Sequence, residues 1–162
     1  VEVMGRHSGF IALDVGIATE AEQIVYPELG LTADTLFSHL KHDIQHYMAH
    51  QGHASYIIVM AENTYPNGSQ PLAETITEHT GIDCKAAILG YIQRGGIANP
   101  SDRILATKLG AYAVESLLAG EKNMMAGEIN GQLDLTPLAL TGNKQKQPDQ
   151  YLLSLFKNKL LA

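Results

Sequence analysis

Residues 86–100, AAILGYIQRGGIANP, carry the clearest indication of a fold. A short apolar run ends in a glycine, and a phenol, an amide and the guanidinium of Arg94 follow it. Ligands of α/β proteins bind at the carboxyl ends of strands, so this order predicts a strand followed by a binding loop. The guanidinium lies beside Gly95 and Gly96, where the backbone can approach an anion closely. The closing Asn-Pro pair predicts the start of a helix.

Strand-like and helix-like patterns alternate along the rest of the chain. The predicted strands are residues 1–4, 23–26, 55–61 and 85–89, with a weaker strand pattern at 126–129. The predicted helices are residues 10–21, 32–49, 71–80, 100–119 and 149–161. This alternation predicts an α/β fold with a mostly parallel sheet and helices on both faces.

The composition excludes several classes of protein. With 162 residues, 45% apolar and 17% charged, the chain is long and apolar enough to build a core. A net charge of −6 without a basic run argues against a nucleic-acid partner, and no apolar run approaches the roughly 20 residues of a membrane span. The single cysteine, Cys84, excludes an internal disulfide and favours a reducing, cytoplasmic location. Because the chain opens on a strand pattern without an initiator methionine, we expect a fragment of a longer protein.

Polar side chains follow three of the predicted strands. Arg6 comes after the first strand, Glu62 after the third, and residues 91–94 after the fourth. Arg6 and Arg94 could bind a phosphate or carboxylate, Arg6 with help from the helix start after Ser8, while Glu62 could accept hydrogen bonds from hydroxyls. Two guanidiniums and one carboxylate predict a sugar-phosphate site, and the alternative is that all three are surface residues at loop starts.

Five histidines form a stripe on one helix face if the second predicted helix extends to residue 53. They are His39, His42, His46, His50 and His53. Pairs four residues apart can bind zinc or nickel, but Asp43 alone could complete a ligand set. We therefore expect a solvent-facing stripe without a bound metal, and the weaker alternative is a metal-responsive protein that uses this stripe. We also expect Cys84 to be a buried structural thiol.

Four segments together resemble the carboxyl half of bacterial-type 6-phosphofructokinase. They are VEVMGRHSGFIAL (1–13), IVYPE (24–28), a strand ending in Ala61-Glu62, and LGYIQRGGIANPSDRILATKLGAYAV (89–114). Their order and spacing match the family up to about Leu135. The strings MGRHSG and IQRGG, with DRILA shortly after, are quite specific to it.

The resemblance implies a reaction and a substrate site. The family transfers the terminal phosphoryl group of ATP, or of pyrophosphate in some members, to the 1-hydroxyl of fructose 6-phosphate, and the full-length enzyme uses Mg²⁺. The sugar phosphate would be bound by Met4, Gly5, Arg6, Ile92, Gln93 and Arg94. Glu62 matches the carboxylate that binds the sugar hydroxyls, and Arg6 would also stabilise charge in the transition state.

Several positions depart from the family pattern. Tyr91 replaces a common histidine of the phosphate loop, and Lys85 replaces an arginine that reaches a neighbouring subunit's site. The resemblance places the effector nucleotide, with its Mg²⁺, near Glu20, Glu22 and His53. The basic residues expected there are absent, so control by ADP or phosphoenolpyruvate does not follow.

The resemblance also implies a division of labour between two halves. Residues 1–98 would form the fructose 6-phosphate-binding domain, and residues 99–162 would pack on a nucleotide-binding domain outside this sequence. That domain carries the catalytic base, the magnesium site and the ATP pocket, so we expect this chain alone to be inactive. The resemblance also implies a homotetramer.

The alternative to half of a kinase is a stand-alone sugar-phosphate-binding or regulatory module without catalysis.

Overall fold

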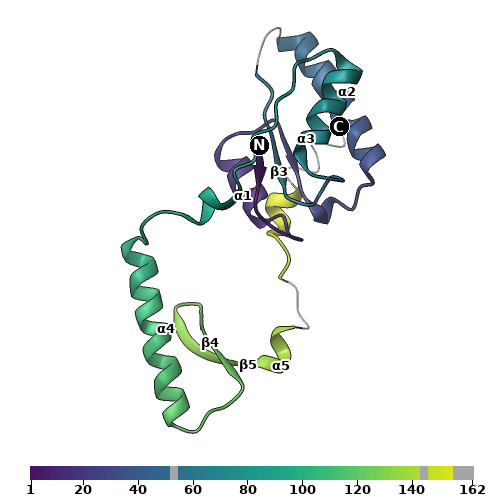
Figure 1. Ribbon diagram of the computed structural model, residues 1–162. Helices are drawn as coiled ribbons and strands as arrows, with labels where there is room; N and C mark the ends of the chain where they lie inside the picture. The colour runs from purple at the N-terminus through teal and green to yellow at the C-terminus, as the bar shows by residue number, and fades with distance from the viewer. Residues whose placement is uncertain (52–54, 143–145, 155–162) are drawn as a thin grey trace. The chain divides into compact units, whose positions relative to one another are not determined.

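The computed structural model describes residues 1–51, 55–142 and 146–154 (Figure 1). Their contacts divide the chain into two compact units. The first unit is Val1–Gly95 together with the stretch that begins at Pro148, and the second is Gly96–Gln147. Each unit is described by itself below.

The first unit contains a parallel sheet. Its strands are β1 (Glu2–Val3), β2 (Gln23–Val25) and β3 (Ile58–Ala61), in the order β1-β3-β2. The register pairs Val3 with Ala61 and Ile24 with Val59. Both pairings are parallel, as the alternation of strands and helices predicts.

The prediction of a strand over residues 85–89 is wrong in its length, since only one bridge forms in this segment. One isolated parallel bridge joins Glu2 to Ile88, and the Glu2 amide donates to Ala87 O at 2.8 Å. The segment therefore lies beside β1 but pairs with it over a single bridge, because β1 is two residues long. The 3₁₀ helix η2 (Gly90–Arg94) follows, and Gly90 has a positive φ of 53°.

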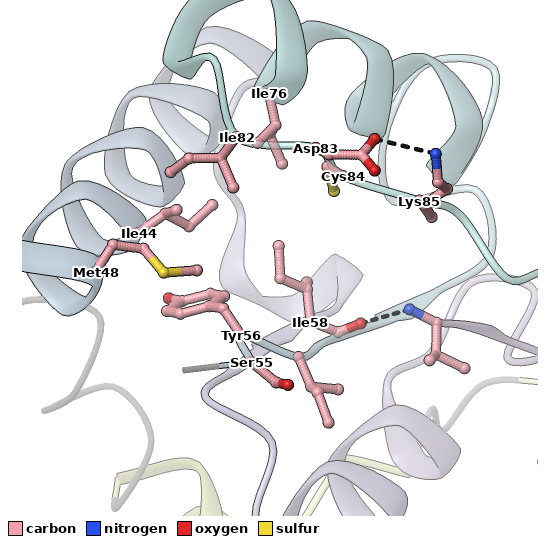
Figure 2. A pocket seen from close by; sticks show the side chains of 12 residues that line it. Ile44, Met48, Ser55, Tyr56, Ile58, Ile76, Ile82, Asp83, Cys84 and Lys85 are labelled. Atoms are coloured by element: carbon pink, nitrogen blue, oxygen red, sulfur yellow. Dashed lines mark hydrogen bonds and ion pairs between the residues drawn. The ribbon is translucent and has the colours of Figure 1, made fainter. Parts of the chain in front are cut away.

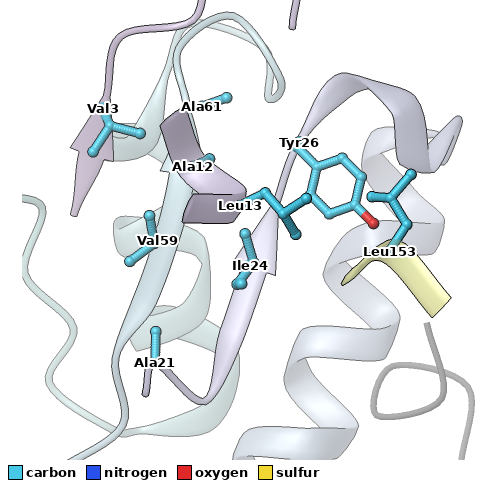
Figure 3. Close-up of a cluster of buried hydrophobic side chains, with 9 residues drawn as sticks. All are labelled: Val3, Ala12, Leu13, Ala21, Ile24, Tyr26, Val59, Ala61 and Leu153. Atoms are coloured by element: carbon cyan, nitrogen blue, oxygen red, sulfur yellow. The ribbon is translucent and has the colours of Figure 1, made fainter. Parts of the chain in front are cut away.

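Helices cover both faces of this sheet, as predicted. On one face, α1 (Phe10–Ala18) packs Leu13 against Ile24 and Tyr26 (Figure 3). On the other face, α2 (Ala33–Gln51) and α3 (Ser69–Thr80) pack around Met60. The side chains of β3 alternate between the two faces, with Val59 and Ala61 on the α1 face and Met60 on the α2–α3 face.

Close packing on the α1 face depends on a glycine. A Cβ added to Gly16 would lie 2.4 Å from Ile24 Cδ1. This contact sets how near α1 can lie to β2. The 3₁₀ helix η1 (Pro27–Leu29) follows β2, and Leu153 packs against the same face from a segment whose residues 150–154 are helical. Asp149 is not helical, and residues 155–161 of the helix predicted at 149–161 lie outside the described residues.

The second unit consists of a helix and a hairpin. Helix α4 (Pro100–Leu118) begins with a capping box, in which the Asp102 amide donates to Asn99 Oδ1 at 2.9 Å. Strands β4 (Met124–Ile129) and β5 (Gln132–Pro137) pair antiparallel, and the short helix α5 (Leu138–Thr141) follows. The weak strand pattern at 126–129 falls within β4, whereas β5 was not predicted. No helix in the described part of the chain is both long and apolar enough to cross a membrane.

Candidate functional site

A cleft of about 400 Å³ opens where β1 and β3 end. It lies within the first unit, and its walls come from the turn after β1, the start of α1, the residue after β3, and η2. The lining residues are Met4, Gly5, Arg6, Ser8, Phe10, Ile11, Glu62, Gln93 and Arg94. Three predicted strand ends therefore meet at one site. Ile92, also predicted, is 77% exposed and does not line it.

The turn after β1 is held by the carboxylate of Glu62. Glu62 Oε1 accepts hydrogen bonds from the amides of Gly5 at 3.2 Å and Arg6 at 2.8 Å. Asn63 Nδ2 donates to Arg6 O at 3.2 Å, and Arg6 has a positive φ of 57°. Among the described residues, no donor bonds Glu62 Oε2. Glu62 thus fixes the backbone of Arg6 and keeps one oxygen for a ligand hydroxyl.

Gly5 is required by the same turn. The Ser8 amide and hydroxyl both donate to Gly5 O at 3.0 Å, which closes the turn. A Cβ on Gly5 would lie 2.3 Å from the backbone oxygen of Ser8. Any side chain there would force the turn open and move the groups that line the cleft.

The start of α1 is already occupied by a carboxylate that sequence analysis did not single out. Glu28 Oε1 accepts from the Gly9 amide at 3.1 Å, and Gly9, the N-cap residue, has no side chain of its own to cap the helix. The Gly9 amide is therefore not available to bind an anion beside Arg6, as the prediction of an anion site at the helix start would require. Glu28 follows Pro27 directly after a strand, and that strand-end position is the signal that could have identified it.

Helix η2 is tied to the end of β1 by Gln93. Its side-chain Oε1 accepts from the Met4 amide at 3.1 Å, and its Nε2 donates to Gly90 O at 3.1 Å. The guanidinium of Arg94 lies over the Tyr91 ring, 6.0 Å from the centroid. Gln93 positions the loop, and Arg94 presents the charge.

The cleft is electropositive. Both Arg6 and Arg94 are exposed, and neither has an ion-pair partner in the described part of the chain. Glu62 is the one carboxylate among the lining residues, and its Oε1 is engaged. Two guanidiniums without carboxylate partners favour a dianionic ligand such as a phosphate monoester. A magnesium ion prefers several carboxylate and phosphate oxygens, so the lining residues alone do not fit one.

Lys85 lies outside this cleft. It pairs with Asp83 at 3.1 Å, and both side chains are more than two-thirds exposed (Figure 2). The pair stands at a second cavity of about 400 Å³, whose other walls include Ile44, Met48 and Tyr56. Within a single chain, the structure does not bring Lys85 to the arginines.

The carboxylate of Glu22 is engaged within the fold. Its Oε1 accepts from the Tyr47 hydroxyl at 3.2 Å, and its Oε2 accepts from the Ile57 amide at 2.6 Å. Glu20 is exposed with a positive φ of 53°. The third predicted effector residue, His53, lies outside the described residues.

A neighbouring polar network joins α2 to the sheet. Asp43 Oδ2 accepts from Gln23 Nε2 and from the Tyr56 hydroxyl. Burial, and then the hydrogen bond to Asp43, raise the pKa of the Tyr56 phenol. Cys84, which we expected to be buried, is half-buried, and this partial burial raises the pKa of its thiol and disfavours the reactive thiolate.

The chain is similar to known phosphofructokinases. The chain matches the Phosphofructokinase family over residues 1–117. It is 43% identical over 155 residues to ATP-dependent 6-phosphofructokinase 1 of Thermus thermophilus. The matched region covers 96% of this chain and 47% of that protein. It is 42% identical over 138 residues to the ATP-dependent 6-phosphofructokinase of Coxiella burnetii, covering 85% of this chain and 40% of that one.

Two solved structures share the fold. The phosphofructokinase of Saccharomyces cerevisiae gives a TM-score of 0.72 at 29% identity, covering 97% of this chain and 20% of that chain. The pyrophosphate-dependent phosphofructokinase of Marinobacter aquaeolei gives a TM-score of 0.74 at 22% identity, covering 98% of this chain and 46% of that chain. At this identity the similarity shows a shared fold and nothing more. The chain spans about half the length of the curated relatives it matches. From the family match and these identities, the chain belongs to the phosphofructokinase family.

Proposed function

We propose that this chain is the carboxyl-terminal, substrate-binding half of an ATP-dependent 6-phosphofructokinase and that its cleft binds fructose 6-phosphate. The observation that carries the proposal is the meeting of Arg6, Arg94 and a Glu62-clamped turn at one edge of the sheet. The names of the curated relatives support the choice of phosphoryl donor and acceptor.

Arg94 is the principal ligand of the 6-phosphate in this proposal. Its forked guanidinium can donate two parallel hydrogen bonds to phosphate oxygens. Gln93 holds η2 against the end of β1, so the guanidinium is presented from a fixed loop. The free Oε2 of Glu62 then accepts from a hydroxyl of the sugar, which orients the ring relative to the phosphate.

Arg6 has two roles in the proposal. Its backbone is fixed by Glu62 and Asn63, so its side chain projects from a rigid turn. From there it contributes to sugar-phosphate binding and stabilises charge on the transferring phosphoryl group. When bound, Mg²⁺-ATP supplies the phosphoryl group and neutralises its charge, and we assign the nucleotide, the metal and the general base to the other half of the enzyme.

We also infer where residues 99–147 act, since Leu153, from the stretch that begins at Pro148, packs in the core of the first unit. Helix α4 exposes apolar side chains that would be buried in a finished enzyme. They include Ile104, Leu105, Val114, Leu117 and Leu118. In the proposal this segment packs on the nucleotide-binding half, and Lys85 serves the site of a neighbouring subunit in a homo-oligomer. Because both oxygens of Glu22 are engaged, an effector nucleotide with Mg²⁺ would have to displace Tyr47 or the Ile57 amide.

Calorimetric titration with fructose 6-phosphate tests the site. We expect Arg94→Ala to weaken binding by about 10- to 100-fold, because it removes charge-assisted hydrogen bonds worth about 1.5–3 kcal/mol. Arg103→Ala is the matched control, since it removes a guanidinium from α4 and should change affinity by less than about twofold. Unchanged affinity in Arg94→Ala would exclude this cleft.

Turnover tests the assignment of the halves. With fructose 6-phosphate, ATP and Mg²⁺, the chain Val1–Ala162 should produce no ADP above background, because it lacks the proposed base and nucleotide site. Measurable turnover that Arg6→Ala abolishes would contradict the assignment. Tight sugar-phosphate binding in a protein whose complete form never turns over would instead identify the regulatory module.

A further inference from the structure

A row of imidazoles lies on α2, outside the cleft described above. His42, His46 and His50 are spaced four residues apart, and all three side chains are exposed. Residues at this spacing share one face of a helix, one turn above another. None of the three lines the cleft at the strand ends.

The two rings nearest the carboxyl end of α2 are the closest pair. The ring centroids of His46 and His50 are 4.1 Å apart, and their planes are tilted by 32°. The centroids of His42 and His46 are 6.4 Å apart. Two imidazoles one turn apart can present nitrogens to the same cation, and the shorter separation favours His46 with His50.

A hydrogen bond fixes the tautomer of His50. Its Nδ1 lies 2.8 Å from His46 O, and a carbonyl oxygen can only accept, so Nδ1 carries the proton. In the neutral ring, Nε2 then holds a lone pair available to a metal. Metal-binding histidines in proteins commonly donate their other ring N–H to a carbonyl or carboxylate in this manner. The ring is therefore oriented before any cation arrives.

We propose that His46 and His50 form a two-imidazole chelate for a divalent transition cation of the copper, nickel or zinc class. Imidazole nitrogens prefer these borderline cations to Mg²⁺ or Ca²⁺, and water completes the coordination. Asp43 Oδ2 accepts from Gln23 and Tyr56, and Asp43 forms no three-residue ligand group with the histidines among the described residues. The proposed protein ligands are therefore His46 and His50 alone.

A cation at this site would act on the end of α2. The chelate joins residues one turn apart in the last turn of the helix and so opposes fraying there. It stabilises the folded state by mass action, in proportion to the logarithm of cation concentration over the dissociation constant. Tyr47, between the two ligands in sequence, donates to Glu22, so stiffening this turn also steadies a contact with the residue before β2.

Calorimetry with Ni²⁺ on the untagged protein tests the chelate. We expect one saturable equivalent, and binding at least about tenfold weaker in both His46→Gln and His50→Gln. His42→Gln is the matched control, an exposed histidine of the same row, and should stay within about twofold of the parent protein. Cu²⁺ should bind more tightly than Ni²⁺, and Mg²⁺ should give no heat of binding.

Two results would overturn the proposal. One is unchanged Ni²⁺ affinity in both His46→Gln and His50→Gln, and the other is an equal loss in His42→Gln, which would assign the cation to a different pair. Nuclear magnetic resonance gives a second readout independent of binding heat. The Hε1 signal of His50 should shift or broaden at substoichiometric Ni²⁺ while that of His79 on α3 stays unchanged.

Discussion

The two units of this chain differ in how they bury their apolar side chains. The nine-residue α1 buries Ala12, Leu13 and Gly16, whereas the 19-residue α4 buries no residue. Strands β4 and β5 likewise contain no buried residue. The first unit therefore has a core of its own on both faces of its sheet. The second has regular hydrogen bonding and an ion pair between Lys108 of α4 and Glu128 of β4, but no buried core, so helix propensity, capping and strand pairing carry most of its support.

The largest expected effect contrasts a buried and an exposed leucine. Leu40 is fully buried on the α2–α3 face, and Leu118 of α4 is 83% exposed. In the chain Val1–Ala162, Leu40→Ala should lower the free energy of unfolding by about 2–5 kcal/mol, since it leaves a cavity. Leu118→Ala should change it by less than about 0.5 kcal/mol. Denaturant titration measures both, and similar losses would mean that the units do not differ as described.

A second contrast uses two helical glycines. Gly16→Ala should destabilise the chain by about 1–3 kcal/mol, because the new Cβ would lie 2.4 Å from Ile24 Cδ1. Gly110→Ala in α4 should stabilise it by about 0.5–1 kcal/mol, because the added Cβ would meet no neighbouring group within 4 Å and alanine is the better helix former. Thermal unfolding of the two variants should therefore shift in opposite directions. Shifts of the same sign would show that the surroundings of these helices are alike.

The smallest expected effect concerns ligand binding at the cleft of the first unit, for which the second unit supplies no lining residue. Tyr91→Ala should weaken fructose 6-phosphate binding by about two- to fivefold, since it removes a cation–π contact worth about 0.5–1 kcal/mol at Arg94. Tyr91→Phe keeps the ring and should preserve affinity. Tyr112→Ala in α4 is the control for loss of a tyrosine. If Tyr91→Phe weakened binding as much as Tyr91→Ala, the hydroxyl rather than the ring would be the important group.

Much of the cleft could be predicted from the sequence because parallel strands end at a common edge. Arg6, Glu62 and Arg94 each follow a strand or bridge segment, and the structure brings all three to one cleft. What could not be predicted is that Glu62 binds the amides of Gly5 and Arg6. That contact depends on the register that sets Val3 beside Ala61, and register follows from packing on both faces of the sheet.

The second unit shows a local signal that the prediction missed. Asn130 and Gly131 both have positive φ, at 51° and 78°, as a two-residue hairpin turn requires. Their sequence is a strong hairpin signal, and the alternation in QLDLTP on its far side is that of β5. The strand was predictable here from turn chemistry, although apolar content alone was too weak to indicate it.

The amino-acid sequence alone was enough to predict the alternation of strands and helices, and with it the edge of the sheet at which polar residues gather. It also determined the four-residue spacing of the histidines on α2. Which polar atoms are engaged follows from tertiary packing: Glu62 Oε1 binds the turn, both oxygens of Glu22 bind their neighbours, and Asp43 Oδ2 binds Gln23 and Tyr56. The physical reason is that periodicity selects the face of an element, whereas a hydrogen bond requires donor and acceptor to meet at a set distance and angle.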